Sequence, residues 1–227
     1  MIRTKLLALS LLTLTTFAAC TQGDQFADLH LTCMTQTTNP QLLQVYKNYS
    51  EANKAQIACP RNGDRIVIME TDLGTIKMRV FDKNVPELSK NFLGLVRSRK
   101  YDNVPFHRVV KNFMIQGGDF TNKDGTGGYS YKGPDTYLPN EINPAYKHLY
   151  GTISMAKTSD PVSIGSQFFI VTNKEGTSFL DGSYSPIGQV YEGMDVAEKI
   201  AALQVTGTEQ PSKAVNMIKV TTTLYTE

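Results

Sequence analysis

The fold of this 227-residue chain is decided by the stretch Phe106-His107-Arg108-Val109-Val110-Lys111-Asn112-Phe113-Met114-Ile115-Gln116-Gly117-Gly118-Asp119-Phe120. It contains two short apolar runs, Phe106–Val110 and Met114–Ile115, and such runs are typical of β-strands. Arg108 is the only arginine of the stretch. A lone arginine beside valines would ordinarily be a solvent-facing residue of a strand, so its role depends on the rest of the chain.

Outward from this stretch, the chain reads as short strands and two helices. Ile66–Met69 is an apolar, strand-like run, and after the turn sequence Asp72-Leu73-Gly74 the residues Ile76, Met78 and Val80 alternate with polar ones. Together they predict a hairpin. Pro86–Lys100 and Met194–Leu203 carry apolar residues at helical spacing. Further strands are predicted at Gly151–Met155, Gln167–Val171, Ile187–Val190 and Val215–Leu224. Many short strands with two helices predict a closed barrel or a sandwich whose ends the helices cover.

Residues 1–19 have the pattern of a secretory signal peptide, with Arg3 and Lys5 before an apolar run that ends in small residues. Cys20 follows Phe17-Ala18-Ala19 directly. This resembles the signal of bacterial lipoproteins, in which the cysteine is lipidated and becomes the first mature residue. We therefore expect an exported protein, lipid-anchored through Cys20 to a bacterial membrane on its periplasmic or cell-surface face. The alternative is a secreted protein with a chance cysteine.

Residues 20–63 are expected to form a lipidated tether and an amphipathic helix ahead of a domain that covers 64–227. Residues 21–38 are polar, which suits a flexible tether. Asn39-Pro40 is a typical helix start, and apolar residues at helical spacing predict a single helix over 40–57.

The two remaining cysteines, Cys33 and Cys59, are most simply paired in a disulfide, because an exported chain folds in an oxidising compartment. Two free thiols are the alternative. A zinc site is excluded, since the cysteines and the three histidines form no closely spaced ligand pairs.

Composition and charge exclude other classes of protein. Removal of Arg3 and Lys5 with the signal leaves as many basic as acidic residues, starting from 23 and 21. A protein that coats nucleic acid needs a basic excess, so no nucleic-acid partner is expected. The apolar run Leu6–Ala19 is too short to span a bilayer as a helix. Nucleophile-elbow, phosphate-loop and calcium-loop motifs are also lacking.

Three later blocks join the opening stretch in a recognisable order: Ser154-Met155-Ala156, Gly165-Ser166-Gln167-Phe168-Phe169-Ile170 and Phe179-Leu180-Asp181-Gly182. Together they resemble the cyclophilin family of peptidyl-prolyl cis-trans isomerases over residues 64–227. The resemblance implies a mainly β fold, a closed eight-stranded antiparallel β-barrel capped by two α-helices, with a short helical N-terminal extension here.

The resemblance also implies a site. Arg108 matches the catalytic arginine of the family, and Gln116 matches the glutamine that orients it. The positions that match the substrate pocket are Phe113, Met114, Ala156, Gln167, Phe169, Phe179, Leu180 and Tyr184. Phe179 replaces a tryptophan, and Tyr184 a histidine, of many eukaryotic members. The loss of the indole N–H donor predicts weak cyclosporin binding.

The implied reaction is rotation about X-Pro bonds of exported proteins, which assists their folding. Rotation breaks no bond, so no nucleophile, metal or cofactor is expected. It also transfers no proton, so we interpret His107 as a structural, hydrogen-bonding histidine rather than a general acid or base.

Two other functions stay open at this point. The chain could be an inactive cyclophilin-like module that binds proline-containing segments, which the intact Arg108 and Gln116 pair argues against. It could also be a lipoprotein whose function lies in residues 21–60. The expected partners are proline-containing polypeptides and, through the lipid, a membrane, and the expected state is a monomer.

Overall fold

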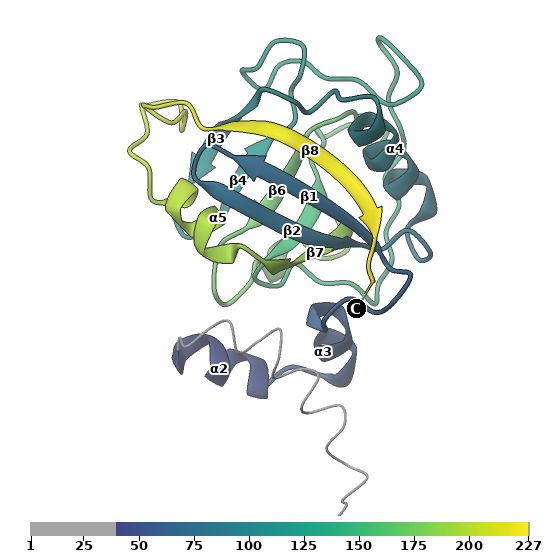
Figure 1. Ribbon diagram of the computed structural model, residues 1–227, viewed down its shortest axis with the longest axis vertical. Coiled ribbons are helices and arrows are strands. Elements are labelled where there is room, and N and C mark those ends of the chain that lie inside the picture. The colour runs from purple at the N-terminus through teal and green to yellow at the C-terminus, as the bar shows by residue number, and fades with distance from the viewer. Residues whose placement is uncertain (1–39, 227) are drawn as a thin grey trace, which may run out of the picture.

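The computed structural model describes residues 40–226 of the chain. The predictions for the signal peptide, Cys20, the tether and Cys33 lie outside the described residues. Eight strands close into a barrel in the order β1-β2-β7-β5-β6-β4-β3-β8 (Figure 1). The strands are β1 Arg65–Thr71, β2 Gly74–Val80, β3 Val104–Val110, β4 Met114–Gly117, β5 Thr152–Met155, β6 Phe168–Val171, β7 Ser185–Glu192 and β8 Asn216–Leu224. The predicted barrel is confirmed, and the sandwich is excluded.

Each neighbouring pair of strands is antiparallel. The predicted hairpin is the β1–β2 pair, in which Thr71 faces Gly74 across the turn. The Thr71 hydroxyl donates to the Gly74 carbonyl at 2.7 Å and accepts from the Leu73 N–H at 3.2 Å, so one side chain closes the turn. This hairpin begins the barrel, and β8 completes it by pairing with β1 and with β3.

Two helices cover the ends of the barrel, as the sequence predicts. Helix α4, Pro86–Arg97, and helix α5, Met194–Ala201, lie at opposite ends in Figure 1. Both bury an apolar face in the central core, for example with Phe92 and Ile200. Proline at the first turn suits α4, and the Glu141 carboxylate accepts the Leu88 N–H at 2.9 Å, which caps this helix from a distant loop.

The N-terminal extension differs from the single helix predicted over 40–57, which is wrong. It forms two helices, α2 Pro40–Lys47 and α3 Glu51–Ile57. Ser50 causes the break: its backbone is extended, and its hydroxyl accepts the Asn53 N–H at 3.2 Å as the N-cap of α3. Both helices pack beneath the barrel (Figure 1) in a small apolar cluster of Leu42, Tyr46, Ile57, Leu149 and Tyr150.

Cys59, just after α3, is disulfide-bonded. Both other cysteines lie outside the described residues, so the pairing with Cys33 stays a prediction. Across the described residues, no helix is both long and apolar enough to cross a bilayer.

Candidate active site

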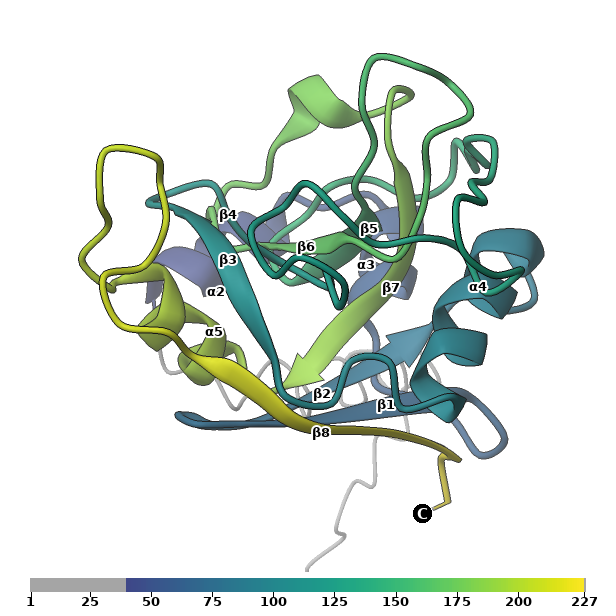
Figure 2. The same ribbon diagram turned by 90° about the horizontal axis from the view of Figure 1, so that it is seen from above.

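Alternation along the strands separates the barrel core from a second apolar cluster on its outer surface. Val109, Ile115 and Ile170 point into the barrel and belong to the central core. Because successive side chains of a strand face opposite sides, their neighbours face outward. The outward strand residues Met114, Phe169 and Val171 form a separate buried cluster with Leu180, which follows β6 in a short 3-10 helix. Val110, Phe113, Ala156 and Tyr184 pack against this cluster. Figure 2 shows β3, β4 and β6 side by side in this wall.

The outer cluster is the floor of a pocket of about 600 Å³. The pocket brings together nearly all of the predicted site residues: Arg108, Phe113, Met114, Gln116, Ala156, Phe169, Phe179, Leu180 and Tyr184. Phe179 lies on the rim with 72% of its surface exposed, and its ring packs on Phe113 at 5.5 Å between centroids. The pocket thus combines an apolar floor with a cationic group at its edge.

Arg108 lies beside Gln116 because the two face each other across the β3–β4 pair. The Gln116 Oε1 accepts from the Arg108 Nη1 at 3.3 Å. On the other side, the Arg108 Nε donates to the Glu209 carboxylate at 2.6 Å. The guanidinium is thus held from two sides, and its remaining N–H groups can meet a ligand in the pocket.

Gln167 does not line this pocket; it holds Gln116 from behind. Its Oε1 accepts from the Gln116 Nε2 at 2.9 Å. Its own Nε2 donates to the carbonyls of Gly125 and Gly127 at 2.8 and 2.7 Å. A polar chain therefore runs from the loop at 121–128 through Gln167 and Gln116 to Arg108.

The buried Asp119 shapes that loop. Its Oδ1 accepts from Thr121 and Asn122, and its Oδ2 accepts from the N–H groups of Gly125 and Gly127 at 2.9 and 3.0 Å. Burial alone would raise the pKa of Asp119, but these hydrogen bonds favour the carboxylate and lower the pKa to about 2. Asp119 is thus ionised across the physiological range.

The hydrogen bonds predicted for His107 are not seen among the described residues. Neither ring nitrogen makes a hydrogen bond to any described residue, and the side chain is buried. Its ring packs against Gly125, where an added Cβ would approach to 3.0 Å and where φ is +96°. Burial lowers the pKa of His107, so a neutral ring fills space beneath the loop. Among the described residues, the contacts of the ring are therefore packing contacts.

Glu209 and Asp119 are positioning residues that the sequence analysis missed. Glu209 lies in the loop between α5 and β8, which runs beside β3 (Figure 2), and its carbonyl accepts the Val109 N–H at 2.8 Å. No local pattern marks it, since its partner Arg108 is 101 residues away. Asp119 had a signal, because an aspartate followed by threonine, asparagine and glycines is typical of a side-chain-capped loop.

Replacement of Glu209 by glutamine is expected to lower kcat/KM about two- to five-fold for the X-Pro isomerisation that the sequence resemblance implies. Glu209→Gln keeps an acceptor for the Arg108 Nε but removes the charge, and both side chains are partly exposed, so the effect is modest. Kinetics of purified variants test it, with the exposed Glu175→Gln as the control. A variant as active as the control would show that Glu209 does not orient Arg108.

The fold and the site define a barrel that presents an arginine and a glutamine over an apolar pocket. Residues 66–222 match the family described as "Cyclophilin type peptidyl-prolyl cis-trans isomerase/CLD". The chain therefore belongs to the cyclophilin-type peptidyl-prolyl cis-trans isomerases.

Relatives agree with this assignment. The chain is 37% identical to the peptidyl-prolyl cis-trans isomerase CYP18-2 of Arabidopsis thaliana, over 71% of this chain and 96% of that protein. It is 38% identical to a bacterial peptidyl-prolyl cis-trans isomerase, from Acinetobacter baylyi, over 60% of this chain and 71% of that protein. The barrel is similar to the crystal structure of a Cryptosporidium parvum cyclophilin, with a TM-score of 0.66, 30% identity, and coverage of 72% of this chain and 99% of that one. A second structure of that protein was determined in the presence of the dipeptide Ala-Pro.

Proposed function

We propose that this isomerase turns X-Pro bonds with Arg108 as the group that stabilises the twisted transition state and Gln116 as its partner toward the substrate backbone. The observation that carries the proposal is the position of the Arg108 guanidinium, held between Gln116 and Glu209 at the edge of the apolar pocket.

The chemistry of the amide explains why one fixed donor is enough. Conjugation of the prolyl nitrogen with the carbonyl resists rotation with a barrier of about 18–20 kcal/mol. In the twisted transition state, that conjugation is lost and the lone pair is localised on nitrogen. An N–H donor aimed at this nitrogen stabilises the transition state more than either planar ground state, and that difference is what accelerates a reaction.

Arginine suits this task because it stays charged and its donors form a rigid fork. Gln116 and Glu209 occupy two of these donors, so the fork does not have to be ordered when the substrate arrives. The apolar floor holds the proline ring while the residue before it rotates. It also excludes water, which would favour the polar planar amide.

An isomerisation assay with a proline-containing tetrapeptide tests the proposal. The wild-type chain is expected to accelerate exchange between the cis and trans forms, and Gln116→Leu to retain less than about a tenth of that rate, because Arg108 loses a partner. Equal rates in the two proteins would refute the proposed pairing of Gln116 with Arg108.

We further propose that the enzyme works outside the cytoplasm, anchored by a lipid on Cys20. The sequence pattern of residues 1–20 supports this, and near-neutral mature charge and an isomerase domain fit a folding catalyst for exported polypeptides. Metabolic labelling with a radioactive fatty acid in a bacterial host tests it. Label and membrane association are expected in the wild type and not in Cys20→Ala; an unlabelled wild type would contradict the anchor.

Cyclosporin binding gives a separate prediction at Phe179. This rim residue offers no hydrogen-bond donor, so the drug is expected to bind weakly, and Phe179→Trp to tighten binding about ten-fold by supplying an indole N–H. Titration calorimetry measures both affinities, with Phe179→Leu as the control for lost ring area. No gain in Phe179→Trp would show that the rim donor is not what limits binding.

A further inference from the structure

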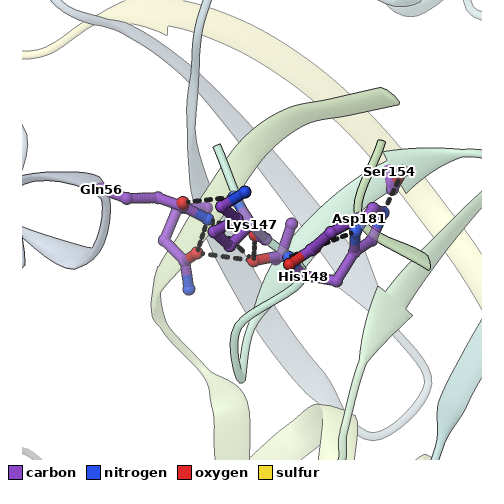
Figure 3. Close-up of polar contacts among 7 residues, drawn as sticks. Gln56, Lys147, His148, Ser154 and Asp181 are labelled. Atoms are coloured by element: carbon purple, nitrogen blue, oxygen red, sulfur yellow. Dashed lines mark hydrogen bonds and ion pairs between the residues drawn. The ribbon is translucent and has the colours of Figure 1, made fainter. Parts of the chain in front are cut away.

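The side chain of Gln56 fastens helix α3 to the barrel (Figure 3). The residue is 1% exposed, and its amide clamps the backbone of Lys147 from both sides. The Gln56 Nε2 donates to the Lys147 carbonyl at 2.7 Å, and the Gln56 Oε1 accepts the Lys147 N–H at 2.9 Å. The same Nε2 also reaches the Thr152 hydroxyl at 3.0 Å. A side chain from outside the barrel thus fixes the two peptide groups that flank Lys147, in the segment that leads into β5.

The next residue, His148, is also 1% exposed and is fully hydrogen-bonded. The Asp181 Oδ1 lies 2.8 Å from the His148 backbone nitrogen and 2.9 Å from its Nδ1. The His148 Nε2 lies 3.1 Å from the Ser154 hydroxyl. Burial lowers the pKa of His148, so the ring is neutral. Because a carboxylate only accepts, Nδ1 carries the proton and Nε2 accepts from Ser154 (Figure 3).

The His148 ring lies directly behind the wall of the pocket. It is parallel to Phe169, with 5.9 Å between centroids and 11° between planes, and it meets Tyr184 edge-on at 6.5 Å. Its partner Asp181 ends the short 3-10 helix η1, Ser178–Leu180, which carries Phe179 and Leu180 of the pocket. Any shift of His148 therefore moves the wall on which the proline ring would rest.

The extension holds the segment of His148 on both sides. Gln56 fixes Lys147 before it, and the apolar residues of α2 and α3 cover Leu149 and Tyr150 after it. We propose that Gln56 is a positioning residue for the proline pocket, acting through Lys147 and His148 on Phe169, Tyr184 and the turn at Asp181. Helices α2 and α3 lie outside residues 66–222, so this support is an addition to the part of the chain that matches the family. The proposal rests on the proposed function of the pocket.

The test compares Gln56→Met with Lys54→Met in the full chain. Methionine has nearly the volume of glutamine but neither donates nor accepts as an amide does, so both bonds to Lys147 are lost. Lys54 lies on the same helix, and within the described part of the chain its side chain pairs with Glu51 of that helix at 2.8 Å. We expect kcat/KM for a proline tetrapeptide to fall about five-fold in Gln56→Met and to stay at the wild-type value in Lys54→Met.

Two readouts separate positioning from a loss of stability. The aromatic NMR signals of Phe169 and Tyr184 are expected to shift in Gln56→Met and not in Lys54→Met. In a double-mutant cycle, Gln56→Met is expected to cause no further fall in kcat/KM when His148→Leu is already present. The reason is that Gln56 acts on the pocket through His148. If Gln56→Met does not fold, Gln56→Asn replaces it, because its amide is one methylene shorter and cannot reach both the N–H and the carbonyl of Lys147.

The outcomes are distinct. A folded Gln56→Met with wild-type activity, unshifted Phe169 and Tyr184 signals, or fully additive effects with His148→Leu would overturn the positioning role. An inactive wild type would instead refute the proposed function itself.

Discussion

Arg108→Ala is expected to lower kcat/KM for X-Pro isomerisation by about 10²- to 10³-fold while leaving the barrel folded. A loss of rate of this size is typical when one preorganised hydrogen-bond donor to a transition state is removed. The side chain is partly exposed and contributes to the pocket rather than to the core, so its loss leaves no cavity in the barrel. Stopped-flow assays and thermal unfolding of the same preparation measure both effects.

Arg108→Lys and Lys111→Ala are the matched controls. Arg108→Lys keeps the charge but cannot donate to Glu209, Gln116 and the substrate at once, so at least about a ten-fold loss is expected. Lys111 is an exposed cation in the neighbouring turn, and its removal is expected to have no effect. Near-normal activity of Arg108→Lys would mean that catalysis requires only a positive charge at this position and not the several N–H donors of the guanidinium.

Asp119→Asn is expected to lower the free energy of unfolding by about 2–4 kcal/mol at pH 7 and kcat/KM by about five-fold. The amide replaces one acceptor oxygen by a donor, which leaves N–H groups such as those of Gly125 and Gly127 without a partner. The loop then loosens around the carbonyls that hold Gln167. Urea unfolding measures the stability, with the exposed Asp124→Asn of the same loop as the control.

The stability difference between wild type and Asp119→Asn should depend on pH in a defined window. The folded pKa of Asp119, about 2, lies below the ordinary value of 3.8. A depressed carboxyl pKa stabilises the fold fully above the unfolded pKa, and that contribution is lost as the pH falls through the folded pKa. The difference in the free energy of unfolding between the two proteins should therefore be constant from pH 7 to about 5 and should disappear toward pH 2. A gap of unchanged size at pH 2 would show that the Asp119 charge is not its cause.

The order of elements and the central pair of the site were accessible from the sequence. The apolar run Ile66–Met69, the turn at Asp72 and the alternating residues up to Val80 predict the first hairpin, which the structure shows as β1 and β2. Arg108 and Gln116 stand on adjacent strands joined by a short turn, and the β3–β4 register places them opposite each other. These features could be predicted because strands that follow each other in the sequence also pair with each other in the barrel.

The division between core and pocket was not accessible from local pattern. Phe168–Val171 is apolar throughout and buried throughout, so alternation gives no sign that Ile170 faces the barrel and Phe169 the pocket. Only the family resemblance placed Phe169 in the site. The contacts of Glu209 with Arg108 and of Gln56 with Lys147 join segments about a hundred residues apart, and no local signal predicts them. The break at Ser50 was missed because apolar spacing continued past a residue suited to an N-cap.

The central claim is that Arg108 at the edge of an apolar pocket makes this chain a catalyst of X-Pro rotation rather than a binder of proline. NMR exchange spectroscopy of an Ala-Pro tetrapeptide tests it most directly, because it observes binding and turnover in one sample. With catalytic amounts of the wild-type chain, exchange peaks between the cis and trans forms are expected within a second, where the uncatalysed reaction takes roughly tens to hundreds of seconds. Arg108→Ala is expected to shift the peptide signals without producing those peaks. If the wild type shifts the peptide signals but produces no exchange peaks, the account is contradicted. The chain would then bind proline-containing peptides without isomerising them.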